Sequence, residues 1–429
     1  MEIDSGNTAW VLASAALVLL MTPGLAFFYG GMTRAKSVLN MMMMSFVSMA
    51  VAGMVWVLWG YSVAFGSEGG IPALFGGLDA WGLVGLETAV TDGLPDLAFA
   101  AFQATFAIIT VALISGAIAD RAKFLTWVVF IPVWLTLVYL PIAHWVWNAE
   151  GWIFKLGAID FAGGTVVHIN AGCAALALAL VLGKRKGWPK EPMRPHNLPF
   201  VLLGAGLLWF GWFGFNGGSA LAANETASLA FLNTIVATGA AGFGWLIVEK
   251  LRDGAATTLG IASGIVAGLV AITPAAAAMT PVGALVLGLV AGAICAVAVG
   301  LKYKLGYDDS LDVVGVHLVG GVIGALAIGV WGSAAFGADS LLAGGGIELL
   351  GKQALAVVAT LAYSFIVTFI IGKVLDLTLG FRVDEEAEVS GIDLAEHAET
   401  AYDFGPSTSG GRSGAPAPVS ADSKVEADA

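Results

Sequence analysis

The chain has 429 residues, of which 58% are hydrophobic and only 12% are charged, and its mean hydropathy is +0.87. Soluble proteins carry about 25% charged residues, so an ordinary soluble protein is excluded. The net charge of −12 also argues against nucleic acid as a partner. The composition predicts a membrane protein, for which we expect an all-α fold, no enzymatic activity and no cofactor.

Eleven apolar runs are long enough to cross a bilayer, which takes roughly 17 to 25 residues. In chain order they cover approximately residues 10–28, 39–64, 97–119, 124–143, 161–182, 198–216, 227–248, 255–272, 282–301, 313–334 and 349–375. The sequence therefore predicts eleven transmembrane helices, which form one transporter domain over residues 1–379.

The basic residues of the short loops predict the orientation of these helices. Thirteen Lys and Arg side chains lie in the loops after spans 1, 3, 5, 7 and 9, whereas the other side has only Lys155 and Lys352. Because the side richer in Lys and Arg is normally cytoplasmic, we expect a multi-pass protein of the cell membrane. Its N-terminus would lie outside and its C-terminus in the cytoplasm.

A weak internal repeat links the fifth and tenth spans. Each contains Val-His, an aliphatic residue, two further residues and Gly, at 167–172 and 316–321. Units of five helices place the second copy upside down in the membrane, as in many transporters. We therefore predict two inverted repeats, at about 8–183 and 197–335, followed by an eleventh helix at about 349–377.

The end of the chain differs from the membrane body. Residues 383–429 contain eleven acidic and two basic side chains, a net charge of −9, and the last 25 residues are rich in Gly, Ser, Pro and Ala. Such a segment has too little apolar surface to fold alone. We predict a cytoplasmic regulatory tail at 380–404 and a disordered extension at 405–429.

His168 and His317 are the candidate pore residues. An ionisable side chain within a span is costly and suggests function, although a buried imidazole bonded to a neighbouring helix is the alternative. Their matched positions in the repeat favour function. A metal site would need further ligands nearby; the two apolar runs add only Cys173, which we interpret as a small core residue, so we expect no metal. Simple helical rise does not bring the rings together, and contact would require recessed or tilted helices, for which Gly163 and Gly164 give room.

Aromatic side chains cluster near the same region: Phe102, Phe106, Trp147, Trp209, Trp212, Phe213 and Phe215. An interfacial belt or a lipid-facing core is the alternative explanation for each ring. Ser219 nearby favours function, because an aromatic face and a hydroxyl oxygen suit a small cation. Asp160 could strengthen the negative potential there, or it could cap the fifth span.

These residues resemble those of the ammonium transporter branch of the ammonium transporter, methylammonium permease and Rhesus superfamily. The similarity covers roughly residues 10–402. It rests on PGLAFFYGG at 23–31, DFAGGTVVHIN at 160–170, PHNLP at 195–199, GWFGFN at 211–216, DVVGVH at 312–317 and GFRV at 380–383. Departures are Gly217, Asn148 and Ala398, where the family usually has Ala, Gly and Gly. Ala398 affects a turn of the tail.

The resemblance implies a homotrimer in membrane lipid, with one pore in each protomer. It assigns the substrate-binding site to Phe102, Phe106, Trp147 and Ser219. It places the gate at Phe106 and Phe215, the pore at His168, His317 and Trp212, and a structural role at Asp160. It also implies a PII signalling protein as a cytoplasmic partner. Trp147 and Ser219 together are typical of the ammonium branch rather than the Rhesus branch.

The predicted function is channel-like transport of ammonium, with methylammonium as an analogue. Carrying a charge to the bilayer centre costs at least about 3 kcal/mol, so loss of a proton before the apolar constriction favours passage as ammonia. Whether the proton follows stays open. The alternatives are an ammonium sensor and a Rhesus-type channel for ammonia or carbon dioxide gas.

Overall fold

The computed structural model describes residues 2–66 and 68–402. Within them, eleven helical spans are long and apolar enough to cross a membrane, as predicted. They are Ser5–Met32, Ala35–Phe65, Asp96–Ile118, Phe124–Leu156, Gly164–Leu182, Leu198–Gly217, Glu225–Asp253, Thr258–Ala275, Pro281–Leu305, Val314–Trp331 and Glu348–Thr378.

The spans are built from α-helices that are in several cases continued by short 3-10 or π-helical segments. The α-helices are α1 (Ser5–Met32), α2 (Val38–Val55), α3 (Tyr61–Phe65), α4 (Asp96–Ile114), α5 (Phe124–Trp134), α6 (Leu140–Trp147), α7 (Trp152–Leu156), α8 (Asn170–Leu182), α9 (Leu198–Trp212), α10 (Glu225–Asp253), α11 (Thr258–Ile272), α12 (Pro281–Ala298), α13 (Leu301–Leu305), α14 (Val319–Trp331) and α15 (Glu348–Thr378). The 3-10 segments are η1 (Ala35–Ser37), η3 (Trp81–Leu83), η4 (Ser115–Ile118), η8 (Thr273–Ala275) and η10 (Ala334–Phe336).

Five segments inside the spans are π-helical: η2 (Trp56–Gly60), η5 (Leu135–Tyr139), η6 (Gly164–Ile169), η7 (Phe213–Gly217) and η9 (Val314–Leu318). Three of them carry His168, Phe215 and His317. A π-helical turn is wider than an α-helical turn and is frequent at functional sites. These segments were not predicted from the hydrophobic pattern.

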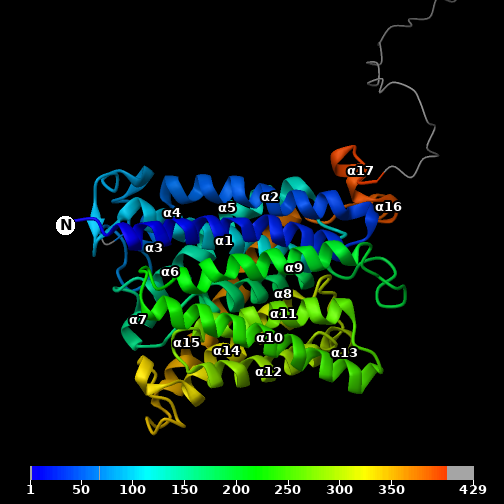
Figure 1. Ribbon diagram of the computed structural model, residues 1–429. Helices are drawn as coiled ribbons and strands as arrows, with labels where there is room; N and C mark the ends of the chain where they lie inside the picture. The colour runs from blue at the N-terminus through cyan, green and yellow to red at the C-terminus, as the bar shows by residue number, and fades with distance from the viewer. Residues whose placement is uncertain (1, 67, 403–429) are drawn as a thin grey trace, which may run out of the picture.

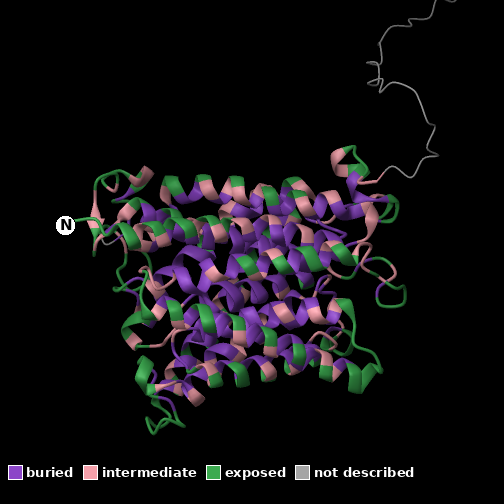
Figure 2. Cartoon of the chain, in the orientation of Figure 1, coloured by how far each residue is buried: buried purple, intermediate pink, exposed green. Residues whose placement is uncertain are grey.

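The spans pack side by side, with the N-terminus at one end of the bundle and the short helices α16 (Glu385–Ser390) and α17 (Ile392–His397) at the other (Figure 1). We call these the N-terminal end and the tail end. Burial is concentrated in the middle of the bundle (Figure 2). Large apolar side chains on the outer surface remain exposed, such as Leu125 (70%) and Val282 (72%). Such a surface suits a lipid environment, where apolar exposure has little cost.

At the N-terminal end, a two-stranded hairpin joins the second and third spans, which the sequence analysis did not predict. Strands β1 (Val90–Thr91) and β2 (Leu94–Pro95) are antiparallel. Asp92 and Gly93 form the turn with φ values of 51° and 82°. Positive φ at both central positions is what a type I′ hairpin turn requires, and Asp-Gly is a preferred sequence for it. The turn therefore presents Asp92 at the rim of the bundle.

At the tail end, carboxylates of residues 384–399 complete the N-termini of two spans. Both oxygens of Asp393 accept backbone N–H groups of α2, from Leu39 at 3.0 Å and Asn40 at 2.8 Å. Glu396 accepts the N–H of Phe124, the first residue of α5, at 2.9 Å. The residues that precede these two helices, Ser37 and Lys123, make no side-chain cap. The predicted extension at 405–429 lies outside the described residues.

Candidate functional site

His168 and His317 lie in contact at the centre of the bundle. Their Nδ1 atoms are 3.3 Å apart, and both residues are buried, with exposures of 1% and 3%. One ring must donate a hydrogen and the other accept it at this distance. Among the described residues, the Nε2 atom of His168 has no hydrogen-bond partner. The pair thus shares one internal hydrogen bond and keeps a polar atom free.

The histidines meet because both of their helices begin inside the bundle. Span 5 begins at Gly164 and span 10 at Val314, so each histidine lies within five residues of its helix start. We predicted starts near 161 and 313, and for span 5 the helix begins three residues later. Since consecutive spans alternate in direction, spans 5 and 10 run in opposite directions and bring their first turns together.

Two glycines allow these spans to cross closely. Gly172 and Gly321 each follow a histidine by four residues, in the repeated pattern of the sequence. A Cβ on Gly172 would lie 2.5 Å from the backbone nitrogen of Leu318, and one on Gly321 would lie 2.9 Å from Cγ1 of Ile169. Real Cβ atoms do not approach so closely. The repeated glycine is therefore what permits contact between the two histidines.

Each helix start is capped by a buried or half-buried aspartate eight residues before its histidine. Asp160 accepts N–H groups of Gly163 (2.9 Å), Gly164 (2.5 Å) and Thr165 (2.8 Å). Its carboxylate thus occupies a capping position, one of the two roles considered above.

Asp309 is the counterpart of Asp160 in the second repeat, and the sequence analysis missed it. It accepts the N–H groups of Val313 at 3.1 Å and Val314 at 2.7 Å. Burial raises the pKa of the Asp309 carboxyl to about 6. The equal spacing of eight residues to the histidine was the signal that could have revealed it.

A continuous line of rings connects the histidine pair with the N-terminal end. The ring centroids of Trp147 and Phe106 are 5.7 Å apart, those of Phe106 and Phe215 4.3 Å, and those of Phe215 and His168 5.9 Å. Phe102 packs on the edge of Phe106 at 4.9 Å. Phe106 and Phe215 are fully buried and close the line between Trp147 and His168.

Hydrogen bonds fix the polar atoms along this line. Trp147 donates its indole N–H to the carbonyl of Asp160 at 3.0 Å. Ser219 donates its hydroxyl hydrogen to the carbonyl of Phe215 at 2.8 Å, which leaves the hydroxyl oxygen free to accept. Trp212 stacks on His168 at 5.4 Å and donates to the Thr273 hydroxyl at 2.8 Å. Thr273 was not predicted, since its distance in sequence hides the contact.

One aromatic residue of the predicted cluster lies elsewhere: Phe213 stacks on Phe231 of α10 at 4.2 Å. Among the described residues, the indole nitrogen of Trp209 has no hydrogen-bond partner. The structure thus brings Phe102, Phe106, Trp147, Trp212 and Phe215 together with the histidines but separates Phe213 from them. Phe213 packs between helices and is not part of the line of rings.

A vestibule of 540 Å³ opens at the N-terminal end beside Trp147. Aromatic walls from Tyr61, Phe65 and Phe99 face the carboxylate-bearing residues Asp92 and Asp96. Ala220 and Leu221, which follow Ser219, also line it. No Lys or Arg lines this vestibule among residues 2–66 and 68–402.

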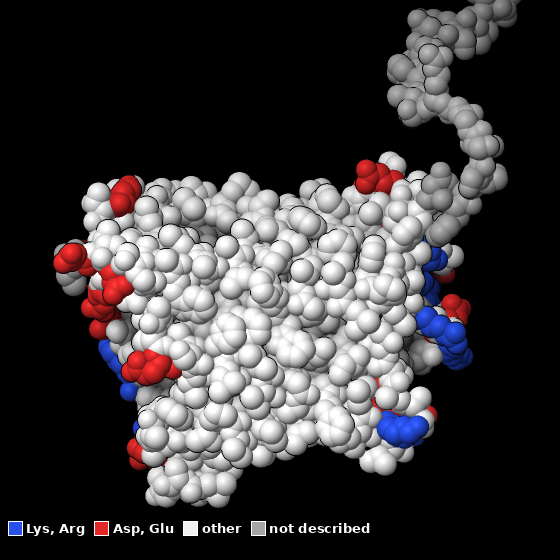
Figure 3. All heavy atoms as spheres, viewed as in Figure 1, with Lys and Arg blue, Asp and Glu red and all other residues white. Residues whose placement is uncertain are grey.

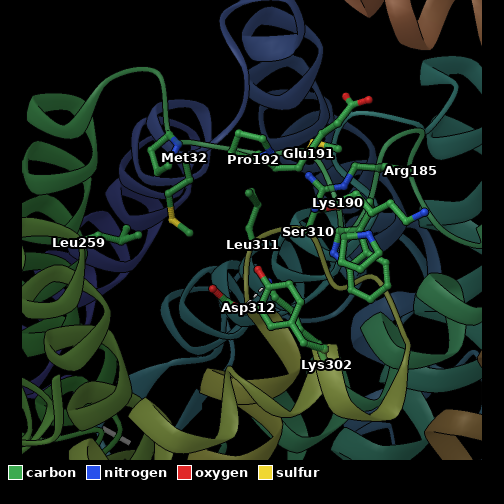
Figure 4. A pocket seen from close by; sticks show the side chains of 15 residues that line it. Met32, Arg185, Lys190, Glu191, Pro192, Leu259, Lys302, Ser310, Leu311 and Asp312 are labelled. Carbon is green, nitrogen blue, oxygen red and sulfur yellow. Dashed lines mark ion pairs between the residues drawn. The ribbon is translucent and has the colours of Figure 1, made fainter. Parts of the chain in front are cut away.

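The tail end contains a second cavity, of 380 Å³, close to the start of span 10 (Figure 4). Lys302 pairs there with Asp312 at 2.7 Å. Arg185 forms two side-chain bonds to Asp308, at 3.0 and 2.9 Å, and a third to Asp120 at 3.1 Å. Although burial alone would raise it, the hydrogen bonds from Arg185 lower the pKa of the Asp308 carboxyl.

The part of the chain that the structure describes contains no group of three or more His, Cys, Asp or Glu side chains placed to hold a metal ion. The two buried histidines have each other and aromatic rings as neighbours. The site can therefore offer cation–aromatic contact, hydroxyl and imidazole hydrogen bonding, and exclusion of water.

Residues 9–402 match the family model described as Ammonium Transporter Family. The chain is 55% identical to an ammonium transporter of Mycobacterium tuberculosis, over 94% of this chain and 91% of that protein. It is 46% identical to ammonium transporter Amt1 of Archaeoglobus fulgidus, over 93% of this chain and all of that protein (100%).

Solved structures agree with this similarity. Saccharomyces cerevisiae Mep2 is 37% identical with a TM-score of 0.84, covering 90% of this chain and 89% of that chain. A protein described as a sensor Amt protein is 31% identical with a TM-score of 0.85, covering 91% and 98% of the two chains.

Proposed function

The chain belongs to the ammonium transporter family, and on this basis we propose that its pore captures ammonium at an aromatic site, removes a proton and passes ammonia along the histidine pair. The observation that carries the proposal is the unbroken line of rings from Trp147 through Phe106 and Phe215 to His168, with steps of 5.7, 4.3 and 5.9 Å.

Capture takes place at Trp147, Phe106 and Ser219. The face of an indole attracts a cation, and a desolvated contact of this kind is worth about 2 kcal/mol. The hydroxyl oxygen of Ser219 accepts one N–H of ammonium, because its own hydrogen is used by the Phe215 carbonyl. Phe102 supports the position of Phe106 by edge contact.

Before the constriction at Phe106 and Phe215, ammonium gives a proton to water in the open vestibule. Whether that proton stays outside or follows by the histidine pair is what the charge moved per ammonium measures. The Phe106 and Phe215 rings are fully buried and offer no hydrogen bond to a charged ammonium. A neutral ammonia passes at lower cost, since placing a charge at the bilayer centre costs at least about 3 kcal/mol. This step separates ammonium from potassium, which has a similar charge but no proton to lose.

Beyond the constriction, the histidine pair provides hydrogen bonds in an otherwise apolar passage. Nδ1 of each ring is occupied by the other ring. Nε2 of His168 is free among the described residues and is the atom that meets ammonia. The stacked Trp212 holds the His168 ring in plane, with Thr273 as its anchor.

The test measures uptake and current together on the full chain in vesicles. We expect the double variant His168→Ala and His317→Ala to fold but to change the uptake rate, the charge moved per ammonium or the selectivity against potassium. The single variant Thr273→Val should lower uptake less, because it releases Trp212 only. A double variant identical to the parent in all three quantities would refute the role of the pair.

The predicted assembly and regulation complete the proposal: a homotrimer in the cell membrane, with its N-terminus outside and a PII protein on the cytoplasmic, tail end. The basic loops at that end and the ordered carboxylates of residues 384–399 support a docking surface there. Deleting 405–429 should leave uptake unchanged, and deleting from 380 onward should impair uptake or its control. Equal behaviour of both truncations would contradict the predicted boundary.

Sensing is a second candidate function, favoured by the similarity to the protein described as a sensor Amt protein. A sensor would bind ammonium and change its tail contacts without appreciable flux. Measured flux in the vesicles distinguishes the two functions.

A further inference from the structure

The two ends of the bundle differ in charge (Figure 3). Within the described residues, the N-terminal end carries twelve carboxylates and two lysines, a net charge of −10, and all other charged side chains, fifteen acidic and fifteen basic, lie toward the tail end. The twelve are Glu2, Asp4, Glu68, Asp79, Glu87, Asp92, Asp96, Glu150, Asp160, Glu225, Asp339 and Glu348.

Both lysines at the N-terminal end form ion pairs with carboxylates of that end. Lys155 pairs with Glu150 at 2.5 Å, and Lys352 pairs with Glu348 at 2.8 Å. Asp92 and Asp96 line the vestibule without a lysine or arginine among its described lining residues. Their field is not cancelled locally and extends into the solution.

Asp92 and Asp96 are the carboxylates that line the vestibule in front of Trp147. The backbone holds both in place. The carbonyl of Gly93, next to Asp92 in the hairpin turn, accepts the N–H of Asp4 at 2.9 Å, and the N–H of Asp96 is donated to Ala89 at 3.0 Å. The vestibule is thus an aromatic-walled space of 540 Å³ with two fixed negative charges.

We propose that Asp92 and Asp96 draw the cation into the vestibule by long-range attraction and so set the concentration at which the site at Trp147 fills. This inference rests on the proposed function. The attraction acts on a hydrated ion before any contact, so it concentrates cations without selecting among them. Selection stays with the rings and histidines deeper in the pore.

The expected size of the effect follows from Coulomb attraction. In water, a carboxylate raises the occupancy of a position about 7 Å away by a monovalent cation roughly threefold. Two carboxylates together give up to about tenfold at low ionic strength. The screening length falls from about 30 Å at 0.01 M salt to about 8 Å at 0.15 M, so the effect must shrink as salt rises.

The experiment compares uptake of methylammonium and ammonium by the full chain in vesicles of neutral phosphatidylcholine. The variant is Asp92→Asn with Asp96→Asn, and the matched control is Asp339→Asn, which lies at the same end but does not line the vestibule. At 0.01 M salt we expect the double variant to need about five to ten times more substrate for half-maximal uptake. At 0.15 M we expect about twofold. The maximal rate and the preference between the two substrates should not change.

Charge reversal gives a second, stronger measurement. Asp92→Lys should raise the half-maximal concentration further than Asp92→Asn at low salt, and Mg²⁺ at low ionic strength should inhibit the parent more than the double variant. If the double variant and the parent have the same half-maximal concentration at both salt levels, the inference is wrong. Absence of uptake by the parent would instead overturn the proposed function, so the two failures are distinct.

Discussion

The two ends of the bundle use the same charged residue types in different ways. At the N-terminal end, Asp92 and Asp96 face a vestibule without a basic partner. At the tail end, Asp308 and Asp120 are buried and bound by Arg185. A carboxylate in solvent contributes a field, whereas a buried, paired carboxylate holds loops together. The comparison teaches that the partner and the burial of a charge decide its role.

The largest expected effect is at the tail end, on stability. Asp308→Ala leaves Arg185 buried and partly unpaired, which should cost about 3 to 5 kcal/mol of the free energy of unfolding. Thermal unfolding in detergent measures it. Asp253→Ala, which breaks the exposed pair with Arg252, is the matched control and should leave the unfolding temperature almost unchanged.

Arg185→Met combined with Asp308→Leu should recover part of this loss, because apolar residues of similar volume replace the buried pair and Asp120 keeps Arg34 as a partner at 3.2 Å. A single Asp308→Ala variant as stable as the control would contradict the structural role assigned to the tail-end charges.

At the N-terminal end the expected effect is on binding and not on stability. Trp147→Leu removes a cation–aromatic contact worth about 2 kcal/mol, so the concentration for half-maximal transport should rise by up to about thirtyfold. Trp145→Leu is the control, since that ring packs on Trp152 and Tyr363 rather than on Phe106. If Trp147→Leu leaves the concentration for half-maximal transport unchanged, the ring acts only as an anchor at the membrane interface.

The tail caps should contribute a smaller amount at the tail end. Asp393→Ala removes two hydrogen bonds from the start of α2, and loss of an N-cap costs about 1 kcal/mol. We expect protease cleavage of residues 380–402 to become faster, with transport as the second measurement. Glu385→Ala, whose partner Lys186 is half-exposed, should have little effect on either.

The smallest effect concerns Ala398, which ends α17 with a φ of 55°. Glycine adopts this left-handed conformation without the steric cost that a Cβ carries. Ala398→Gly should therefore stabilise tail docking by less than about 1 kcal/mol, measured as slower proteolysis of the tail. Leu394→Gly, in the body of α17, should have the opposite sign.

The sequence predicted the elements that depend on local composition and missed those that depend on distant contacts. The eleven spans could be predicted from hydropathy, because each span must be long and apolar enough to cross the bilayer and must form its own backbone hydrogen bonds. The recessed, π-helical starts of spans 5 and 10 depend on packing between the two halves. That packing explains why simple rise placed His168 and His317 apart.

The candidate site, like the fold, was predicted only in part from the sequence. The predicted fourth span ended at residue 143, whereas the structure continues it through α6, which ends at Trp147. Asp309 was not predicted, because its spacing of eight residues to His317 is informative only when it is compared with the equal spacing between Asp160 and His168. The capping of α2 and α5 by Asp393 and Glu396 could not be predicted, since the partners lie more than 270 residues apart.

Gly172 and Gly321 have a consequence for how the histidine pair is assembled. Each lies on one half of the chain and makes room for the other half, and each half supplies one histidine. A single five-helix unit would contain one histidine and one of the two glycines only. The contact between the rings therefore belongs to neither half alone, and a side chain larger than glycine at either position is expected to force the two histidines apart.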